Sequence, residues 1–188
     1  MEYRSDLIVE KDSDVYPPSE DSILLITSFN ITPGDRVLEI GCGSGIVSMH
    51  CALNGGIVTC GDLNKKAVSL TKRNMERNSL TAEVVETDLY SNITGKFDTI
   101  VFNLPYLPVE EKGDLALAWS GGKGGLGPLP GLLSGAYDHL LPNGRIIIVV
   151  SSLMDQEALR SVLLGLNVKV LSELSLFFEK ISVLELSL

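Results

Sequence analysis

The sequence predicts an α/β fold with a seven-stranded, mostly parallel sheet that carries helices on both faces and ends in an antiparallel hairpin. Strand and helix patterns alternate along most of the 188 residues, as expected for strands joined by crossover helices. The continuous apolar run at residues 146–150 is typical of a strand buried on both sides. No helical pattern separates the last two strand patterns, so we expect them to pair as the hairpin.

The predicted elements follow an N-terminal segment of different character. Residues 1–30 are strand-like at 7–9, then polar, then helical from 19 to 29, where a hydroxyl and acidic side chains suit a helix start. Further strands are expected at residues 36–40, 57–61, 82–86, 97–102, 145–150, 168–174 and 177–186. Further helices are expected at residues 45–53, 65–78, 129–140 and 154–164, with a long loop at 103–127. We therefore expect one domain over 1–188, in which residues 1–30 form a strap or lid on a core at 31–188.

Charge and cysteine content disfavour several classes of protein. The formal net charge is −9 and no basic run is present, which makes free nucleic acid an unlikely partner because phosphate neutralisation requires Lys and Arg. The three cysteines, Cys42, Cys51 and Cys60, form no Cys-x-x-Cys pair, so neither a disulfide framework nor a metal site is predicted. No apolar run approaches the roughly 18 residues that cross a bilayer, and no basic start precedes an apolar stretch, so we expect a reduced, cytoplasmic setting without a membrane.

Three alternating glycines, Gly41, Gly43 and Gly45, follow the strand at 36–40 and precede a helical pattern. Residues without a Cβ permit a tight turn and a close approach of backbone to ligand, and the next helix directs its first N–H groups to that point. The pattern indicates a nucleotide cradle, although glycine-rich turns between strands and helices are common.

Polar side chains close the next strands, and ligands of open α/β sheets bind at these carboxyl ends. Asp62 closes the second strand about twenty residues after the glycines, where a carboxylate can accept hydrogen bonds from two ribose hydroxyls. Asp88 and Leu89 close the third strand and could hold an adenine amino group and ring. A helix cap at Asp62 and a simple turn at Asp88 are the structural alternatives.

The tetrapeptide Asn103-Leu104-Pro105-Tyr106 follows the apolar strand at 97–102. The Asn103 side-chain oxygen and the Leu104 carbonyl could both accept from one NH2 group, which would direct its nitrogen lone pair at an electrophile. We expect Tyr106 to be an exposed aromatic beside this group. The alternative is that an Asn before X-Pro only ends a strand.

These residues resemble class I S-adenosylmethionine-dependent methyltransferases of the amino-methylating group, whose hallmark is Asn/Asp-Pro-Pro-Tyr/Phe. Leu104 stands at the second position, where it keeps the backbone carbonyl but loses a ring that stiffens the loop. Residues 14–22, Asp-Val-Tyr-Pro-Pro-Ser-Glu-Asp-Ser, resemble the Val-Tyr-x-Pro-x-x-Asp-Thr signature of HemK-type protein glutamine methyltransferases. Residues 118–123 resemble the Ala-Trp-x-Gly-Gly segment of their archaeal and eukaryotic branch. The resemblance covers nearly the whole chain and implies a Rossmann-like class I methyltransferase fold.

The resemblance also implies a role for each matching residue. The methionine part of S-adenosylmethionine would be surrounded by Glu39 and the turn of Gly41, Gly43 and Gly45, with the Ser22 hydroxyl at its carboxylate. Ribose would lie at Asp62 and Leu63, and adenine at Asp88 and Leu89. Tyr16 and Pro18 would form part of a lid, although an ordinary N-terminal strap is the alternative for both. The catalytic and substrate-binding residues would be Asn103, which also meets the cofactor, Leu104, Pro105 and Tyr106, with Trp119 as a substrate-side anchor.

The implied activity is methylation of the side-chain amide nitrogen of a glutamine, with the Gly-Gly-Gln motif of a translation termination factor as the expected substrate. An adenine-N6 methyltransferase of DNA or RNA uses the same tetrapeptide, but the acidity and the missing target-recognition domain disfavour it. A noncatalytic cofactor-binding partner subunit is disfavoured by the intact Asn103, Pro105 and Tyr106.

The resemblance also implies a partner. Members of this branch commonly work with a small zinc-binding activator protein, and the 45% hydrophobic content permits an exposed apolar strip for such a partner.

Overall fold

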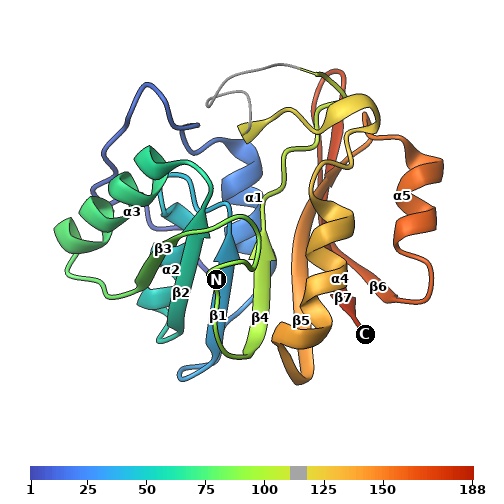
Figure 1. The fold of residues 1–188 in the computed structure, drawn as a ribbon. Helices are drawn as coiled ribbons and strands as arrows, with labels where there is room; N and C mark the ends of the chain where they lie inside the picture. The colour runs from blue at the N-terminus through green and yellow to red at the C-terminus, as the bar shows by residue number, and fades with distance from the viewer. Residues whose placement is uncertain (111–117) are drawn as a thin grey trace.

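A computed structural model describes residues 1–110 and 118–188 of the chain. Its centre is a seven-stranded sheet with the strand order β3-β2-β1-β4-β5-β7-β6 (Figure 1). The strands are β1 (Arg36–Ile40), β2 (Ile57–Asp62), β3 (Glu83–Glu86), β4 (Phe97–Phe102), β5 (Leu140–Ser151), β6 (Asn167–Ser175) and β7 (Lys180–Ser187). Strands β1 to β5 pair in parallel, whereas β7 runs antiparallel to both β5 and β6. The predicted fold, including its C-terminal antiparallel hairpin, is confirmed.

Helices cover both faces of this sheet. One core lies under α1 (Glu20–Ser28), α2 (Ile46–Leu53) and α3 (Lys65–Arg77), and the other under α4 (Leu129–His139) and α5 (Gln156–Val162). Along β5, Ile147 faces the first core and Ile146 and Ile148 face the second, and all three are fully buried. This burial on both sides is what the continuous apolar run predicted.

The segment at residues 7–9 is not a strand, so that prediction is wrong. Its backbone pairs with a side chain of α3, because the Ile8 N–H donates to Asn78 Oδ1 (2.9 Å) and the Ile8 carbonyl accepts from Asn78 Nδ2 (2.8 Å). Leu7 and Val9 pack against the core beneath the helices. An alternating pattern indicates only that one side of an extended segment is buried, and here the neighbour is a helix.

Some element ends differ from the predicted ones for local reasons. Helix α5 begins at Gln156 because the Asp155 carboxylate caps it, accepting from the N–H groups of the second and third residues that follow. Strand β7 begins at Lys180 because the Leu176 N–H donates to the Glu179 carbonyl and closes a tight turn. Residues 111–117 of the predicted loop lie outside the described residues. Within the described part of the chain, no helix combines the length and apolarity that a membrane crossing requires.

Candidate active site

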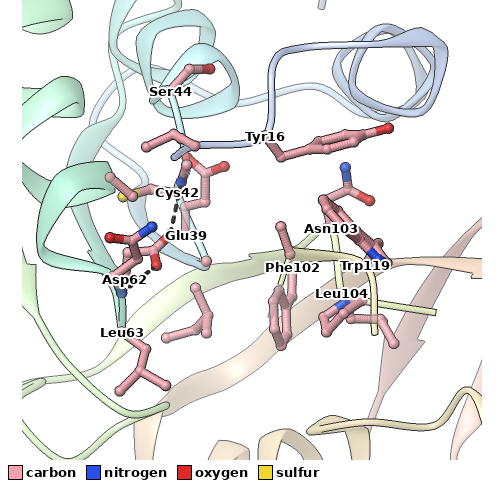
Figure 2. Close-up of a pocket in the computed structure, with 18 of the residues that line it drawn as sticks. Tyr16, Glu39, Cys42, Ser44, Asp62, Leu63, Phe102, Asn103, Leu104 and Trp119 are labelled. Atoms are coloured by element: carbon pink, nitrogen blue, oxygen red, sulfur yellow. Dashed lines mark hydrogen bonds between the residues drawn. The ribbon is translucent and has the colours of Figure 1, made fainter. Parts of the chain in front are cut away.

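A cavity of about 450 Å³ lies at the carboxyl ends of the parallel strands, the place where open α/β sheets bind ligands. The predicted site residues that line it are Tyr16, Pro18, Ser22, Glu39, Gly41, Gly43, Asp62, Leu63, Asp88, Leu89, Asn103, Leu104, Pro105, Tyr106 and Trp119. Gly45 lies behind the cavity wall, where it precedes α2 and packs against Thr71. Figure 2 shows Glu39 and Asp62 on one side of the cavity and Asn103 and Trp119 on the other.

The turn after β1 is joined to Asp62 at the end of β2. Gly41 and Gly43 have φ angles of 68° and 53°, a backbone region that favours glycine. The Gly43 N–H donates to Asp62 Oδ2 (2.9 Å), and the Asn64 N–H donates to Asp62 Oδ1 (2.8 Å). Burial raises the pKa of the Asp62 carboxyl despite these bonds. Because a carboxylate has about four acceptor sites, Asp62 can accept further hydrogen bonds from a ligand.

Glu39 is a buried carboxyl group at the floor of the cavity. Ser48, in the first turn of α2, donates to Glu39 Oε2 from its N–H (2.8 Å) and from its hydroxyl. Burial raises the pKa of Glu39 to about 8, which outweighs the opposing effect of the two Ser48 donors. Glu39 therefore holds a proton near neutral pH.

The loop after β3 contributes Asp88 and Leu89 to the cavity wall. Leu89 has a φ angle of 48°, a left-handed conformation that is uncommon for a large side chain. The Thr87 hydroxyl donates to the Leu89 carbonyl (3.1 Å), and Leu89 Cδ1 packs closely on Gly131 of α4. Tertiary contacts thus hold a strained residue at the wall, which is common in ligand sites.

Asn103 follows β4, which pairs directly with the glycine-bearing strand β1. The Asn103 Oδ1 atom is buried, and it accepts no hydrogen bond from the residues that the structure describes. Leaving a buried amide oxygen without a donor costs about 1–3 kcal/mol. The site therefore holds an acceptor that a ligand N–H group can satisfy.

Leu104, the residue after Asn103, is a core residue. It is 1% exposed and packs into the core with α4 and β5, so its carbonyl is the group that it can offer to a ligand.

Tyr106 is not an exposed aromatic, and that expectation is wrong. Its half-buried ring packs against both cores, and its hydroxyl lies 3.5 Å from Asp21 Oδ2. The reason is tertiary: α1 and the segment before it cover the loop after β4.

The glycine-rich segment after Trp119 supports the Asn103 loop from behind. A Cβ atom at Gly121 would lie 2.7 Å from the Pro105 carbonyl oxygen, and one at Gly125 would lie 2.5 Å from the Tyr106 carbonyl oxygen. Only residues without a Cβ permit this approach of two backbones. These glycines therefore have a structural role that their sequence pattern alone did not indicate.

Comparison with known proteins agrees with this geometry. The profile of the family "Methyltransferase small domain" matches residues 18–176. A candidate protein N5-glutamine methyltransferase of Methanocaldococcus jannaschii is 39% identical over 178 residues, which cover 91% of this chain and 90% of that protein. Human methyltransferase HEMK2 is 33% identical over 153 residues, which cover 73% of this chain and 72% of that protein. The chain belongs to the HemK-type methyltransferases.

Among solved structures, Mtq2 of E. cuniculi in its complex with Trm112 has a TM-score of 0.71. The similarity covers 92% of this methyltransferase and 98% of that chain at 19% sequence identity. At such a low identity the comparison shows a shared fold. The fold and the enzyme class expected from the sequence, a Rossmann-like methyltransferase, are therefore confirmed.

The methyltransferase cavity also contains a residue that sequence reasoning missed. Asp21 is 4% exposed and lines the cavity. Its Oδ1 atom accepts from the Ser19 hydroxyl (2.6 Å) and the Ser22 N–H (2.5 Å), while Oδ2 faces the Tyr106 hydroxyl. Asp21 stands at the Asp of the HemK-type signature that residues 14–22 resemble, so this motif was the signal that could have identified it. The sequence does not reveal that the first turn of α1 lines the cavity.

The N-terminal segment borders one side of the methyltransferase cavity. Val15, Tyr16 and Pro18 contribute to its lining, and the centroids of the Tyr16 and Trp119 rings are 6.4 Å apart. The Asn64 side chain donates to the Asp14 carbonyl (2.8 Å) and ties this segment to the start of α3. Aromatic side chains from two distant segments thus lie beside Asn103 (Figure 2).

Proposed function

We propose that this methyltransferase uses S-adenosylmethionine to methylate the side-chain amide nitrogen of a protein glutamine, in the Gly-Gly-Gln motif of a translation termination factor. The observation that carries the proposal is the buried Asn103 Oδ1, which lacks a donor among the described residues and shares one cavity with the Gly41 and Gly43 turn. The names of similar proteins support it. They include a candidate protein N5-glutamine methyltransferase and a complex responsible for methylation of the eRF1 translation termination factor.

The residues on one side of the cavity fit S-adenosylmethionine, which supplies an activated methyl group when bound. Asp62 can accept from the ribose hydroxyls, since its two backbone donors leave acceptor sites unused. Asp88 and Leu89 suit the adenine amino group and ring, and Ser22 and Glu39 suit the methionine part. A Cβ atom at Gly43 would project toward Tyr16, so glycine at this position keeps the cavity open for a ligand.

Asn103 and Leu104 would orient the glutamine amide. A planar NH2 group offers two donors, one for Asn103 Oδ1 and one for the Leu104 carbonyl, so that both bonds together fix the plane of the amide. Tyr106 and Pro105 line the same wall and would restrict rotation of that plane. An amide nitrogen is a weak nucleophile, and two acceptors would increase its electron density as the new C–N bond forms. The bond between the methyl carbon and the sulfonium sulfur would break at the same time, and one N–H proton would leave to solvent. The residues would therefore act mainly by alignment.

The test is the substitution Asn103→Ala, assayed with a termination-factor domain and with a short Gly-Gly-Gln peptide. We expect turnover to fall about 100-fold or more, because an alignment contact made in the transition state is lost. The cofactor Kd should stay within about 2-fold of wild type, because the Asp62 and glycine contacts persist. Mass spectrometry should locate the added methyl group on the glutamine. Asn167→Ala, an exposed amide at the start of β6, is the matched control and should behave as wild type.

Several outcomes would contradict the proposal. Normal turnover by cofactor-bound Asn103→Ala would remove Asn103 from the reaction. Methylation of an adenine-containing oligonucleotide in place of the peptide would favour the adenine-N6 alternative. Cofactor binding by wild-type protein without transfer to peptide, protein or oligonucleotide would favour a noncatalytic subunit.

We also propose that a small activator protein binds this methyltransferase. Two large apolar side chains, Phe177 and Phe178, are exposed next to each other with ring centroids 4.5 Å apart, and contiguous exposed apolar groups often mark partner surfaces. The E. cuniculi relative was solved as a complex with Trm112. Full solubility and full activity of the purified chain would contradict an obligatory activator.

Since the proposed substrate is a translation factor, the proposed location is the cytoplasm.

A further inference from the structure

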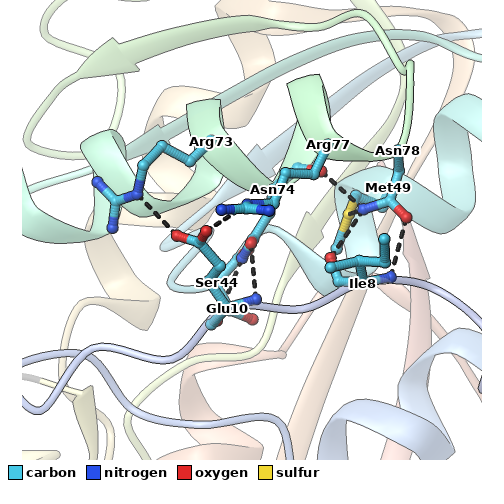
Figure 3. Close-up of polar contacts among 8 residues, drawn as sticks. All are labelled: Ile8, Glu10, Ser44, Met49, Arg73, Asn74, Arg77 and Asn78. Atoms are coloured by element: carbon cyan, nitrogen blue, oxygen red, sulfur yellow. Dashed lines mark hydrogen bonds and ion pairs between the residues drawn. The ribbon is translucent and has the colours of Figure 1, made fainter.

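Helix α3 holds the segment at residues 8–16, which we call the N-terminal strap. The strap lies across the helix, and its last two residues, Val15 and Tyr16, line the cavity. Figure 3 shows that side chains along the helix reach the strap, namely those of Arg73, Asn74, Arg77 and Asn78. The strap belongs to no strand, and side chains of α3 thus supply hydrogen bonds that its backbone requires.

Asn74 differs from its neighbours because it bonds two separate segments. Its Oδ1 atom accepts from the Glu10 N–H (2.8 Å), and its Nδ2 atom donates to the Ser44 carbonyl (2.9 Å) and, over a longer distance, to the Glu10 carbonyl (3.4 Å). Ser44 belongs to the glycine turn and lines the cavity. The Asn74 side chain is fully buried (0% exposed), so water cannot replace these bonds without rearrangement.

Asn78 is a natural comparison one helical turn later. It bonds the Ile8 backbone in both directions, with the N–H at 2.9 Å from Oδ1 and the carbonyl at 2.8 Å from Nδ2. Its Nδ2 atom also donates to Met49 Sδ and to the Asn74 carbonyl, and neither of these belongs to the glycine turn. Asn78 therefore holds the strap alone, whereas Asn74 holds the strap and the turn together.

We propose that Asn74 is a positioning residue for the cofactor, because its single amide sets the distance between the glycine turn and the N-terminal strap. The inference rests on the proposed function, since it assumes that the cavity binds S-adenosylmethionine. The Val15 side chain and the Tyr16 carbonyl both lie about 4.0 Å from the position of a Cβ built at Gly43, so the strap and the turn face each other across the cofactor side of the cavity. Thr71 assists by donating to the Gly43 carbonyl (3.0 Å). Loss of the Asn74 amide would release both walls of this side at once.

The surface charges around Glu10 have a different role. Its carboxylate forms ion pairs with Arg73 (2.9 Å) and Arg77, and these arginines are about half exposed. Exposed ion pairs contribute little and are weakened by salt. They hold the strap to α3 but do not reach the glycine turn. Among these side chains, Asn74 is therefore the one that links the position of the strap to that of the turn.

The test compares Asn74→Asp, Asn74→Ala and Asn78→Ala. Aspartate keeps the acceptor for the Glu10 N–H but has no donor for the Ser44 carbonyl or for the longer contact with the Glu10 carbonyl. It therefore removes the bond to the glycine turn and leaves the shorter bond to the strap. We expect both Asn74 variants to weaken S-adenosylmethionine binding about 5- to 10-fold by calorimetry, the effect of one lost buried hydrogen bond. Asn78→Ala should increase proteolytic cleavage within the strap while the cofactor Kd changes less than about 2-fold. At saturating cofactor, kcat of the Asn74 variants should remain close to that of wild type.

Equal cofactor affinity in Asn74→Asp and wild type would overturn the inference, as would equal weakening by Asn78→Ala. Asn74 variants that stay unfolded with saturating cofactor would show a purely structural role and also overturn it. A failure of wild-type protein to bind S-adenosylmethionine would instead contradict the proposed function. Binding by wild type without glutamine methylation would contradict only the substrate, because the calorimetric comparison needs no methyl acceptor.

Discussion

Glu39→Gln should change how the stability of the cofactor-free protein depends on pH. Glu39 is buried in β1, and burial raises the pKa of its carboxyl from 4.5 to about 8. Between these values the folded protein binds one proton more than the unfolded chain at this position. Stability contributed by this group is therefore complete below pH 4.5 and is lost as pH rises toward about 8. Glutamine has nearly the same shape and does not titrate, so the variant lacks this loss.

The size of the effect follows from the two pKa values. At about 1.4 kcal/mol for each pH unit, the difference between 4.5 and about 8 corresponds to an upper bound of about 5 kcal/mol. Glutamine can still accept from the Ser48 N–H, which lies 2.8 Å from the Glu39 carboxylate. We therefore expect the variant to resemble wild type in acid and to be several kcal/mol more stable at alkaline pH.

Urea denaturation of both cofactor-free proteins between about pH 5 and about pH 9 would measure this difference. Asp62 and the other titrating groups are common to both proteins, so their contributions largely cancel in the comparison. Parallel stability profiles would refute the reasoning, because they would mean that Glu39 has the same pKa in the folded and unfolded states. A variant that loses stability relative to wild type as pH rises would refute its sign.

Three further substitutions test the packing around the site. Leu104→Ala should lower the free energy of unfolding by about 2–4 kcal/mol, because the side chain is 1% exposed; a change near zero in urea denaturation would contradict its place in the core. Gly45→Ala should cost about 1–3 kcal/mol, because φ is 80° and the new Cβ would lie 2.8 Å from Thr71 Cγ2; an unchanged melting temperature would argue against this contact. Tyr106→Phe should alter stability by less than about 1 kcal/mol, because the hydroxyl lies as far as 3.5 Å from Asp21; a larger loss would indicate a stronger bond.

The order of the elements could be predicted because it depends on local patterns. The bounds predicted for β1 and β4 agree with Arg36–Ile40 and Phe97–Phe102, where apolar runs end at glycine or at Asn103. Two-sided burial of β5 was also predictable from its continuous apolar run. Likewise, most of the predicted site residues share one cavity, since each follows the carboxyl end of a strand or belongs to a recognised motif.

Other features depended on contacts between distant segments. The strand expected at 7–9 pairs with α3, Tyr106 is covered by α1, and Asp21 is a buried cavity residue. The periodicity of apolar residues along the sequence indicates that a side chain is buried, but it does not indicate which segment covers that side chain. The partners of Ile8 and Tyr106 lie far along the chain, so no local pattern could identify them. Asp21 could have been identified from the signature at residues 14–22, although its burial could not.

The sequence by itself determined the alternation of strands and helices, the terminal hairpin and the chemical types of the groups at the strand ends, because these follow from local periodicity and from motif residues. Only the tertiary structure decided that Asn103 Oδ1 has no donor among the described residues, that burial raises the pKa of Glu39, and that Asn74 joins the strap to the glycine turn. Each of these properties is set by burial and by the distance between atoms from separate parts of the chain. Such distances exist only once the sheet and its two helical layers have assembled.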